Sequence, residues 1–356
     1  MDWAWEQWKK NEYPGHHLWG ATHLHQYGIH VDILRHEKYS FLKKISSKIK
    51  VLGDLDQQLR LLLKEPDYDL VFCAHDLSTS LLAFLRSIGL FKKPIVIVMH
   101  RSFKETLWSK IFVETFIKRH DKFICLSPII MENFRDRFKV PEEKLSFLEW
   151  GVDLSFYQKK QSNFLDEIKK ENEPPFFISA GKTGRDYNTL AKAFCEISYP
   201  LKIYCSGDVA PTIPNITSNI ILQNKSSTEK NFLSLDDLLK EYEKAFAVAI
   251  PLDIPLERVD TVTQIGITSL LEAMAMGKAV VMTRNRQIEL DIEEEGIGIF
   301  VEPGDVKGWK EAVSYLINHP QETKEMGNRA RCLCKSRYDL DDFSSKLADI
   351  LKSIKL

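Results

Sequence analysis

The sequence predicts an α/β fold built from two doubly wound, Rossmann-like domains. Short apolar runs that end near Gly, Pro, Asp or Ser alternate with longer stretches of helical period, as βαβ units do. The alternation stops at one polar, charged segment in mid-chain and then restarts. The length of 356 residues also exceeds what one hydrophobic core usually serves. Two domains joined by a linker account for all three observations.

The first domain is expected over residues 1–154. Its candidate strands are apolar enough for parallel strands covered on both faces, with helices between them. They span residues 29–34, 49–52, 70–74, 94–99, 122–126 and 145–148. No apolar strand precedes the turn at Pro14 and Gly15, although a doubly wound domain normally begins with one. We expect the natural start to lie a few residues upstream; the alternative is a domain that tolerates the loss of that strand.

The second domain is expected over residues 176–339. Residues 155–175 before it are polar and charged and close with two prolines, so they are the expected linker. The alternation then resumes with candidate strands at 176–180, 201–206, 219–222, 245–250, 279–283 and 297–301. The last segment, 340–356, is amphipathic and has no strand partner, so we expect a helix that packs back on the first domain.

Composition excludes several classes of protein. Hydrophobic residues make up 44% and charged residues 28%, and no run reaches the ~18 apolar residues of a membrane span. A net charge of -1 lacks the basic excess of a nucleic-acid-binding protein. The six cysteines form no CxxC set, and four lie in or beside apolar runs, so we expect them to be reduced core residues. The first residues are acidic and rich in tryptophan, unlike a signal peptide, which predicts a cytoplasmic protein.

The segment QIGITSLLEAMAMGKAVVMTR, from Gln264 to Arg284, predicts a helix followed by a strand. Free N–H groups at Thr268 and Ser269 would point out of the helix start. Such a terminus carries about half a positive charge and suits a phosphate or diphosphate. Glu272 lies one turn in, where its carboxylate could reach a ribose. The alternative is an ordinary capped helix with a solvated glutamate.

A second segment, FFISAGKTGRDYNTLAKAF, also suits an anion. An apolar strand runs into a turn that carries Lys182 and Arg185, and a helix opens at Asp186. A basic pair on a turn between strand and helix can clamp a diphosphate. The alternative is two solvated basic residues in a loop.

The stretch GITSLLEAMAMGKAVV resembles the donor-site helix of the retaining, family-four glycosyltransferases of GT-B fold. The resemblance implies two Rossmann-like domains that face each other across a cleft, with the nucleotide held mainly by the C-terminal one. It implies that Glu272 binds the ribose hydroxyls of a nucleotide sugar. Gln264 stands where the family has a glutamate that helps to hold the donor hexose. The chain departs from the pattern there, because an amide carries no charge.

Other segments resemble the same family, in the same order along the chain. Lys182 and Arg185 are the nearest equivalents of the basic pair that neutralises the donor diphosphate. In the family the arginine comes before the lysine, whereas here the lysine comes first and the two are closer in sequence. YPGHHLWG implies that Gly15 lies near the donor phosphates or sugar, and IYCSGD implies a nucleotide contact at Gly207. IVIVMH implies that His100 is the active-site histidine.

Further polar and aromatic residues carry weaker predictions. His75 and Asp76 follow a strand and are candidates for an acceptor pocket, or else end the strand structurally. The helix after Ser102 has Trp108, Phe112 and Phe116 at helical spacing with basic residues between them. We expect this stripe to face the core, and the alternative is contact with a membrane surface.

Five histidines are dense near the N-terminus: His16, His17, His23, His25 and His30. Their density suggests a metal site. No carboxylate or cysteine recurs among them at ligand spacing, and a helix would scatter them over several faces. We therefore expect no metal.

The resemblance implies a retaining, hexosyltransferase-like enzyme of class EC 2.4, with a nucleotide-diphosphate sugar as donor and UDP or GDP as the expected nucleotide. The resemblance also implies a metal-independent enzyme. Lys182, Arg185 and the helix terminus at Thr268 and Ser269 would meet the leaving-group charge that a divalent cation neutralises in other transferases. No cofactor is expected. The expected acceptor is a saccharide, a lipid-linked molecule or a small molecule in the cytoplasm, where contact with the inner membrane face is an option. No nucleic-acid partner is expected. The alternatives are a nucleotide-sugar epimerase of GT-B fold and a non-catalytic nucleotide- or sugar-binding protein.

Overall fold

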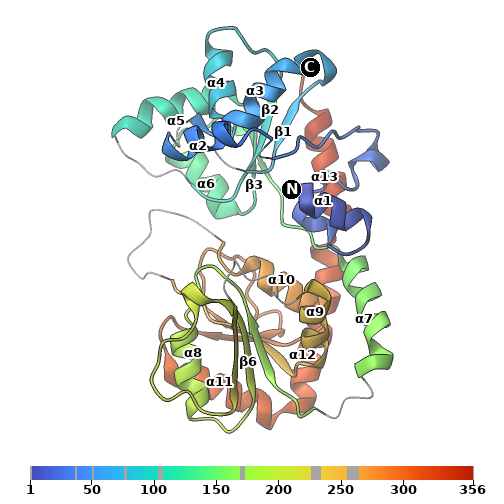
Figure 1. Cartoon of the computed structure of the whole chain (residues 1–356), viewed down its shortest axis with the longest axis vertical. Helices are drawn as coiled ribbons and strands as arrows, with labels where there is room; N and C mark the ends of the chain where they lie inside the picture. Colours follow the sequence, from blue (N-terminus) through green and yellow to red (C-terminus); the bar gives the residue numbers. More distant parts are fainter. Residues whose placement is uncertain are drawn as a thin grey trace.

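A computed structural model describes residues 2–36, 38–49, 52–75, 78–102, 107–168, 173–225, 234–254 and 264–355. Figure 1 shows two α/β bodies, with the C-terminal helices running from one to the other. One body holds a four-stranded sheet in the order β1-β2-β3-β4, and the other a six-stranded sheet in the order β10-β9-β8-β5-β6-β7. All strand pairs are parallel. The predicted α/β class is therefore confirmed.

The N-terminal sheet contains four of the predicted strands. They are β1 (Val71–Cys73), β2 (Ile95–Met99), β3 (Lys122–Cys125) and β4 (Leu145–Phe147). Every residue of β2 is buried, as the apolar sequence of this strand predicts. The helices of this body are α2 (Ser40–Lys48), α3 (Leu55–Leu63), α4 (Ser80–Ser87), α5 (Leu107–Arg119) and α6 (Pro128–Asp136).

Two strands predicted for this sheet do not form among the described residues. Residues 29–34 form no strand, and Ile29 and Val31 pack instead beside the core cluster that contains Leu24 and Val96. Ile49 and Leu52 are not in a strand, and residues 50 and 51 lie outside the described part of the chain. A helix, α1 (Asp2–Lys9), precedes the Gly15 turn. The backbone N–H and C=O groups of a strand must pair with a neighbouring strand. None of the described strands pairs with residues 29–34 or with Ile49 and Leu52.

The C-terminal sheet confirms all its predicted strands. They are β5 (Phe177–Ala180), β6 (Leu201–Ser206), β7 (Ile220–Lys225), β8 (Ala247–Ile250), β9 (Val280–Thr283) and β10 (Gly298–Val301). Its helices are α8 (Tyr187–Cys195), α9 (Leu235–Lys244), α10 (Ile267–Ala275), α11 (Val306–Asn318) and α12 (Pro320–Arg337). Because β5 pairs with both β6 and β8, the strand order reverses between β5 and β8. Ligands of such sheets bind beyond the carboxyl ends of the strands at this switch point.

The segment expected as a linker begins with a packed helix, α7 (Leu154–Ile168). Phe156, Tyr157 and Phe164 of this helix are buried in the same core cluster as Leu239 of α9 and Leu271 of α10. Apolar residues spaced along a polar helix thus attach α7 to the C-terminal body.

Helix α13 (Leu340–Lys352) packs on the N-terminal sheet, where its Leu347 lies in one core cluster with Val98. The chain therefore crosses between the bodies twice, and the two crossings touch. Val152 N–H donates to Tyr338 O at 2.7 Å, and Leu340 N–H donates to Val152 O at 3.1 Å. A side chain at Gly151 would clash with Phe343 and Leu340, so only glycine allows this approach.

The tested aromatic and cysteine predictions are confirmed in part. Phe116 faces the core with 1% of its surface exposed, whereas the side chains of Trp108 and Phe112 lie outside the described residues.

The six cysteines are free thiols, and Cys125, Cys205 and Cys334 are buried. Cys332 is exposed, which corrects its expected place in the core. None of the described helices is both long and apolar enough to cross a membrane.

His120 is a wholly buried polar residue between α5 and β3. Its Nδ1 donates to Phe116 O at 2.6 Å, so its Nε2 accepts from the Thr79 hydroxyl at 2.8 Å. Burial lowers the pKa of His120 from 6.5 to about 4. The folded protein therefore holds this imidazole neutral.

His120 should make the stability of the fold depend on pH. The unfolded chain binds a proton at this residue near pH 6.5 and the folded chain only near pH 4, so stability should fall as the pH drops through that window. In His120→Gln, whose side chain does not titrate, the loss of stability between pH 7 and pH 5 should be smaller. Urea unfolding of both proteins at the two pH values measures this; an equal loss would contradict it.

Candidate functional site

Helix α10 begins at the carboxyl edge of the C-terminal sheet. Gly266 caps it in a left-handed conformation with φ of 97°, and a Cβ there would lie 2.9 Å from both Leu252 and Met282 side chains. Only glycine lets the chain turn this tightly into the helix. The N–H groups of the first turn, at Thr268 and Ser269, lack intrahelical acceptors and carry the positive end of the helix dipole. The helix start is therefore suited to an anion.

Arg185 lies against this helix start. Its Nη2 donates to Ser269 Oγ at 2.7 Å, and its Nη1 donates to Thr183 O at 3.0 Å. The guanidinium lies over Gly181, where any side chain would clash with it. Its buried Nε finds no acceptor among the described residues. The turn after β5 and the start of α10 thus form one positively charged corner at the switch point.

Lys182 and Gly207 border this corner. Lys182 is exposed on the turn that carries Arg185. Gly207 is exposed at the end of β6, the strand next to β5, and a Cβ there would meet nothing within 4 Å. The protein itself therefore does not require glycine at position 207, and the space beside it is open.

The N-terminal loop reaches Glu272 on α10. Gly15, at the start of the short helix η1 (Gly15–Leu18), donates its N–H to Asp153 Oδ2 at 2.8 Å. His17 Nε2 lies 3.8 Å from Glu272 Oε1, and the Glu272 side chain is 28% exposed. Burial, with a smaller effect of the Glu272 charge, raises the pKa of Tyr13 to about 12. Glu272 is thus partly exposed and faced by a loop from the start of the chain.

His16, His17 and Glu272 form a cluster in which one ligand atom of each lies within 4.8 Å of the others. The Asp153 N–H donates to His16 Nδ1 at 3.3 Å, so the proton of the neutral ring sits on Nε2. Burial lowers the pKa of His16 well below 6.5, and its Nε2 finds no partner in the described part of the chain. A protonated nitrogen cannot ligate a metal, so this geometry favours hydrogen bonding over metal binding.

His100 follows β2 on the N-terminal side of the cleft. Its Nε2 donates to Ala74 O at 2.8 Å, and its ring packs edge-on against Trp19 with centroids 4.5 Å apart. Trp150 completes this aromatic cluster at 4.3 Å from Trp19. His75 is exposed, with its ring 6.5 Å from that of His100. Asp76 lies outside the described residues.

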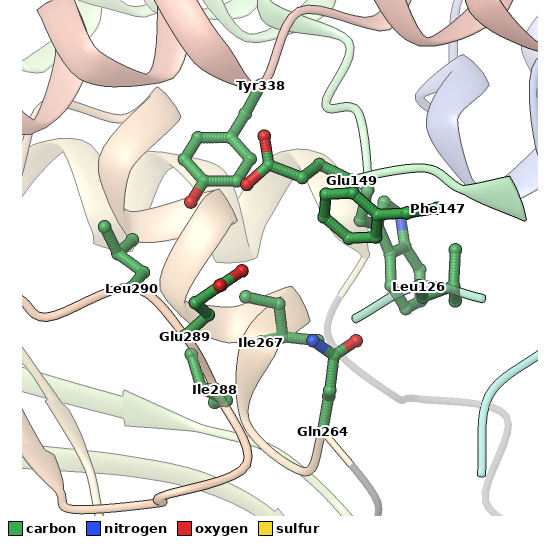
Figure 2. Close-up of a pocket in the computed structure, with 10 residues that line it drawn as sticks. Leu126, Phe147, Glu149, Gln264, Ile267, Ile288, Glu289, Leu290 and Tyr338 are labelled. Atoms are coloured by element: carbon green, nitrogen blue, oxygen red, sulfur yellow. The ribbon is translucent and has the colours of Figure 1, made fainter. Parts of the chain in front are cut away.

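A small, partly open pocket lies between the two bodies beside Gln264. Figure 2 shows residues from both sides on its walls. Its lining consists of Leu126, Phe147, Glu149, Trp150, Gln264, Ile267, Ile288, Glu289, Leu290 and Tyr338. Arg337 Nη2 donates to Glu149 Oε1 at 2.6 Å and holds this carboxylate at the wall.

The structure brings together part of the predicted site. Arg185 touches Ser269, and Glu272 follows on the same helix. The loop that begins at Gly15 faces Glu272 through His17. His75 and His100 lie on the N-terminal side, and Gln264 opens onto the pocket between the bodies.

Sequence reasoning missed the Glu149 and Glu289 carboxylates, which line the same pocket as Gln264. It also missed the contact of His17 with Glu272. The only sequence signal for Glu149 was its place at the end of the apolar run of β4, next to Trp150. Glu289 and His17 reach the site only through the fold.

Two family profiles match the chain. The profile of glycosyltransferase family 4 matches residues 19–156, and that of the glycosyl transferases group 1 matches residues 231–332. The D-rhamnosyltransferase WbpZ of Pseudomonas aeruginosa is 22% identical over 245 residues, which cover 67% of this chain. The match spans 62% of the length of that relative.

Several solved structures share the fold at low sequence identity. Anabaena Alr3699/HepE in complex with UDP has a TM-score of 0.60 and 14% identity over 88% of this chain and 89% of its own. A glycosyltransferase from Rickettsia africae has a TM-score of 0.60 and 15% identity over 93% and 86%. Sucrose-phosphate synthase from Thermosynechococcus elongatus has a TM-score of 0.60 and 14% identity over 90% and 80%. These similarities confirm the predicted GT-B fold.

Proposed function

The chain belongs to family four of the glycosyltransferases, and from this premise we propose that it moves a sugar from a nucleotide-diphosphate sugar to an acceptor hydroxyl, with retention of anomeric configuration. The observation that carries the proposal is the contact of Arg185 with Ser269 at the start of α10. It places a guanidinium and the first N–H groups of a helix at one corner of the switch point. That corner is where a doubly wound sheet binds the phosphates of a nucleotide.

The positive corner acts on the leaving group. As the bond from the sugar to the diphosphate breaks, negative charge grows on the diphosphate oxygens. Arg185, Lys182 and the N–H groups near Thr268 and Ser269 meet that charge without a metal ion. The Arg185 contacts with Thr183 and Ser269 fix the guanidinium in advance, so little reorganisation accompanies the reaction.

Glu272 is proposed to hold the ribose. It lies one helical turn beyond Ser269, so a ribose attached to a diphosphate at the corner comes within its reach. A carboxylate accepts hydrogen bonds from both ribose hydroxyls. His17 then limits the space beside the ribose, because it faces the same carboxylate. Gly207, with nothing within 4 Å of its would-be Cβ, leaves room for the nucleotide on the neighbouring strand end.

The transferred sugar is proposed to lie between Gln264 and His100. The Gln264 amide can donate and accept hydrogen bonds to sugar hydroxyls, but it cannot stabilise positive charge at the anomeric carbon. Glu289 supplies a carboxylate in the same pocket, whereas the charge of Glu149 is balanced by Arg337. Gly15 is proposed to approach the donor from the N-terminal loop, and His75 and Asp76 to approach the acceptor.

UDP is the first nucleotide to test, because the similar Anabaena structure holds UDP. GDP is the second. A saccharide, a lipid-linked molecule or a small molecule is the proposed acceptor, used in the cytoplasm or at the inner face of the membrane. A panel of UDP-, GDP- and ADP-sugars in a thermal-shift assay identifies the donor, since a ligand at a hundred times its dissociation constant stabilises by roughly 2.7 kcal/mol.

One observation favours a second function, a nucleotide-binding protein without turnover. Gln264 lacks the charge that a carboxylate at this position would bring to the pocket. Such a protein would keep the phosphate and ribose contacts and lose only the chemistry. Nucleotide binding alone therefore does not distinguish the two functions, whereas sugar transfer does.

Lys182→Ala and Arg185→Ala should each weaken binding of a nucleoside diphosphate much more than binding of the bare nucleoside. Charge-assisted hydrogen bonds of this kind contribute roughly 1.5 to 3 kcal/mol, which is ten- to more than a hundredfold in affinity. Titration calorimetry with both ligands measures the difference. Lys192→Ala, an exposed lysine on α8, is the matched control and should change neither affinity. Equal losses for nucleoside and diphosphate would mean that the two residues only support the fold.

Glu272→Gln should weaken a ribonucleotide far more than its 2'-deoxy counterpart. The deoxy ligand already lacks one hydroxyl that the carboxylate accepts from, so the two losses should not add. Binding of both ligands to both proteins completes the cycle. Additive losses would show that Glu272 does not contact the ribose.

A further inference from the structure

Exposed apolar side chains concentrate on one part of the N-terminal body. Of the thirteen large hydrophobic residues exposed in the described part of the chain, nine lie between residues 39 and 90, on or beside α2, α3 and α4. They are Tyr39, Phe41, Ile45, Ile49, Leu59, Leu63, Phe84, Ile88 and Leu90. Single exposed apolar residues are ordinary, but a concentration of them marks an interaction surface.

Helix α2 is the clearest case. None of its residues is buried, although the helix is amphipathic. Phe41, Ile45 and Ile49 follow one another at four-residue spacing and so share one side of the helix. They are 60%, 41% and 47% exposed. A helix that only served the core would turn this side inward.

The same segment is strongly basic. Residues 35–50 hold six Lys and Arg residues and one acidic residue, whereas the whole chain has a net charge of -1. Lys43, Lys44 and Lys48 are exposed on α2 itself. Lys44 and Lys48 are four residues apart and border the side that carries Phe41 and Ile45. We call Phe41, Ile45, Ile49, Lys44 and Lys48 together the α2 surface; Lys43 points to the opposite side of the helix.

We propose that the α2 surface docks on a bilayer that contains anionic phospholipids. Its apolar side chains would enter the headgroup region while its lysines stay at the lipid phosphates, as in other basic amphipathic helices that lie on membranes. A purely electrostatic partner, such as a nucleic acid, would leave the exposed Phe41 and Ile45 without a role. The proposal differs from the helix after Ser102 that the sequence suggested for membrane contact.

This inference goes beyond sugar transfer and does not depend on it. The α2 surface lies in the N-terminal body (Figure 1), and no residue of the proposed nucleotide site belongs to α2. Lipid binding and nucleotide binding can therefore fail separately. A protein that binds vesicles but no nucleotide would contradict the proposed function alone.

Co-sedimentation of the full chain with vesicles tests the proposal. Vesicles of phosphatidylcholine with phosphatidylglycerol should bind the protein, and vesicles of phosphatidylcholine alone should bind it much less. High salt should weaken the binding, because exposed charges are screened. Reversing Lys44 and Lys48 to Glu should weaken it by at least about twentyfold, since each lysine near an anionic surface contributes about fivefold.

A second variant, Phe41→Ser with Ile45→Ser, should also weaken binding to anionic vesicles while leaving the circular dichroism spectrum unchanged. The matched control reverses Lys307 and Lys324, which are exposed on α11 and α12, and so changes net charge as much as reversing Lys44 and Lys48 does. This control should bind vesicles nearly as the natural chain does. Equal loss in the control, no binding to anionic vesicles, or a lipid-free dimer abolished by Phe41→Ser with Ile45→Ser would overturn the proposal.

Discussion

The contact of Arg185 with Ser269 is the interaction on which the proposed chemistry depends, and the topology of the second sheet explains why it forms. Strands β5 and β8 are neighbours at the point where the strand order reverses, so the segments that leave them emerge at one edge. One segment is a basic turn and the other leads into α10. Gly181 and Gly266 allow both to turn closely enough for a guanidinium to reach the helix start. Glu272 then lies one turn further along.

The N-terminal loop is held at this site by the Asp153 carboxylate. Asp153 Oδ2 accepts from Gly15 N–H at 2.8 Å, and its Oδ1 accepts from Phe156 N–H at 3.1 Å at the start of α7. Because α7 is packed in the core of the second body, Asp153 holds the N-terminal loop against that body and so brings His17 to Glu272. Backbone hydrogen bonds of Val152 with Tyr338 and Leu340 also join the segment before α7 to the segment between α12 and α13.

A strand predicted from an apolar run forms when a second strand lies beside it to pair with its backbone. Each strand of the second sheet is an apolar run with a neighbouring run to pair with, and all form. Residues 29–34 were also predicted as a strand but pair with none in the described part of the chain, so sequence pattern alone was insufficient. In the site, Arg185 and Ser269 were each predicted from their own motif, but their contact joins residues 84 positions apart. His17 was set aside because no carboxylate recurs near it in sequence, and Glu272 comes to it only through the fold. The exposure of α2 has no local signal either, since an amphipathic helix usually faces the core.

The most direct test of the account is sugar transfer by the natural chain and by Gln264→Glu, with the best-binding nucleotide sugar, an acceptor panel and EDTA present. The account predicts transfer without a divalent ion, a product of retained anomeric configuration by NMR, and turnover that survives or rises in Gln264→Glu at nearly unchanged nucleotide affinity. No transfer and no donor hydrolysis by either protein, with nucleotide binding intact, would contradict the enzyme and leave a binding protein. Strict dependence on a divalent ion would contradict the role given to Arg185 and the start of α10.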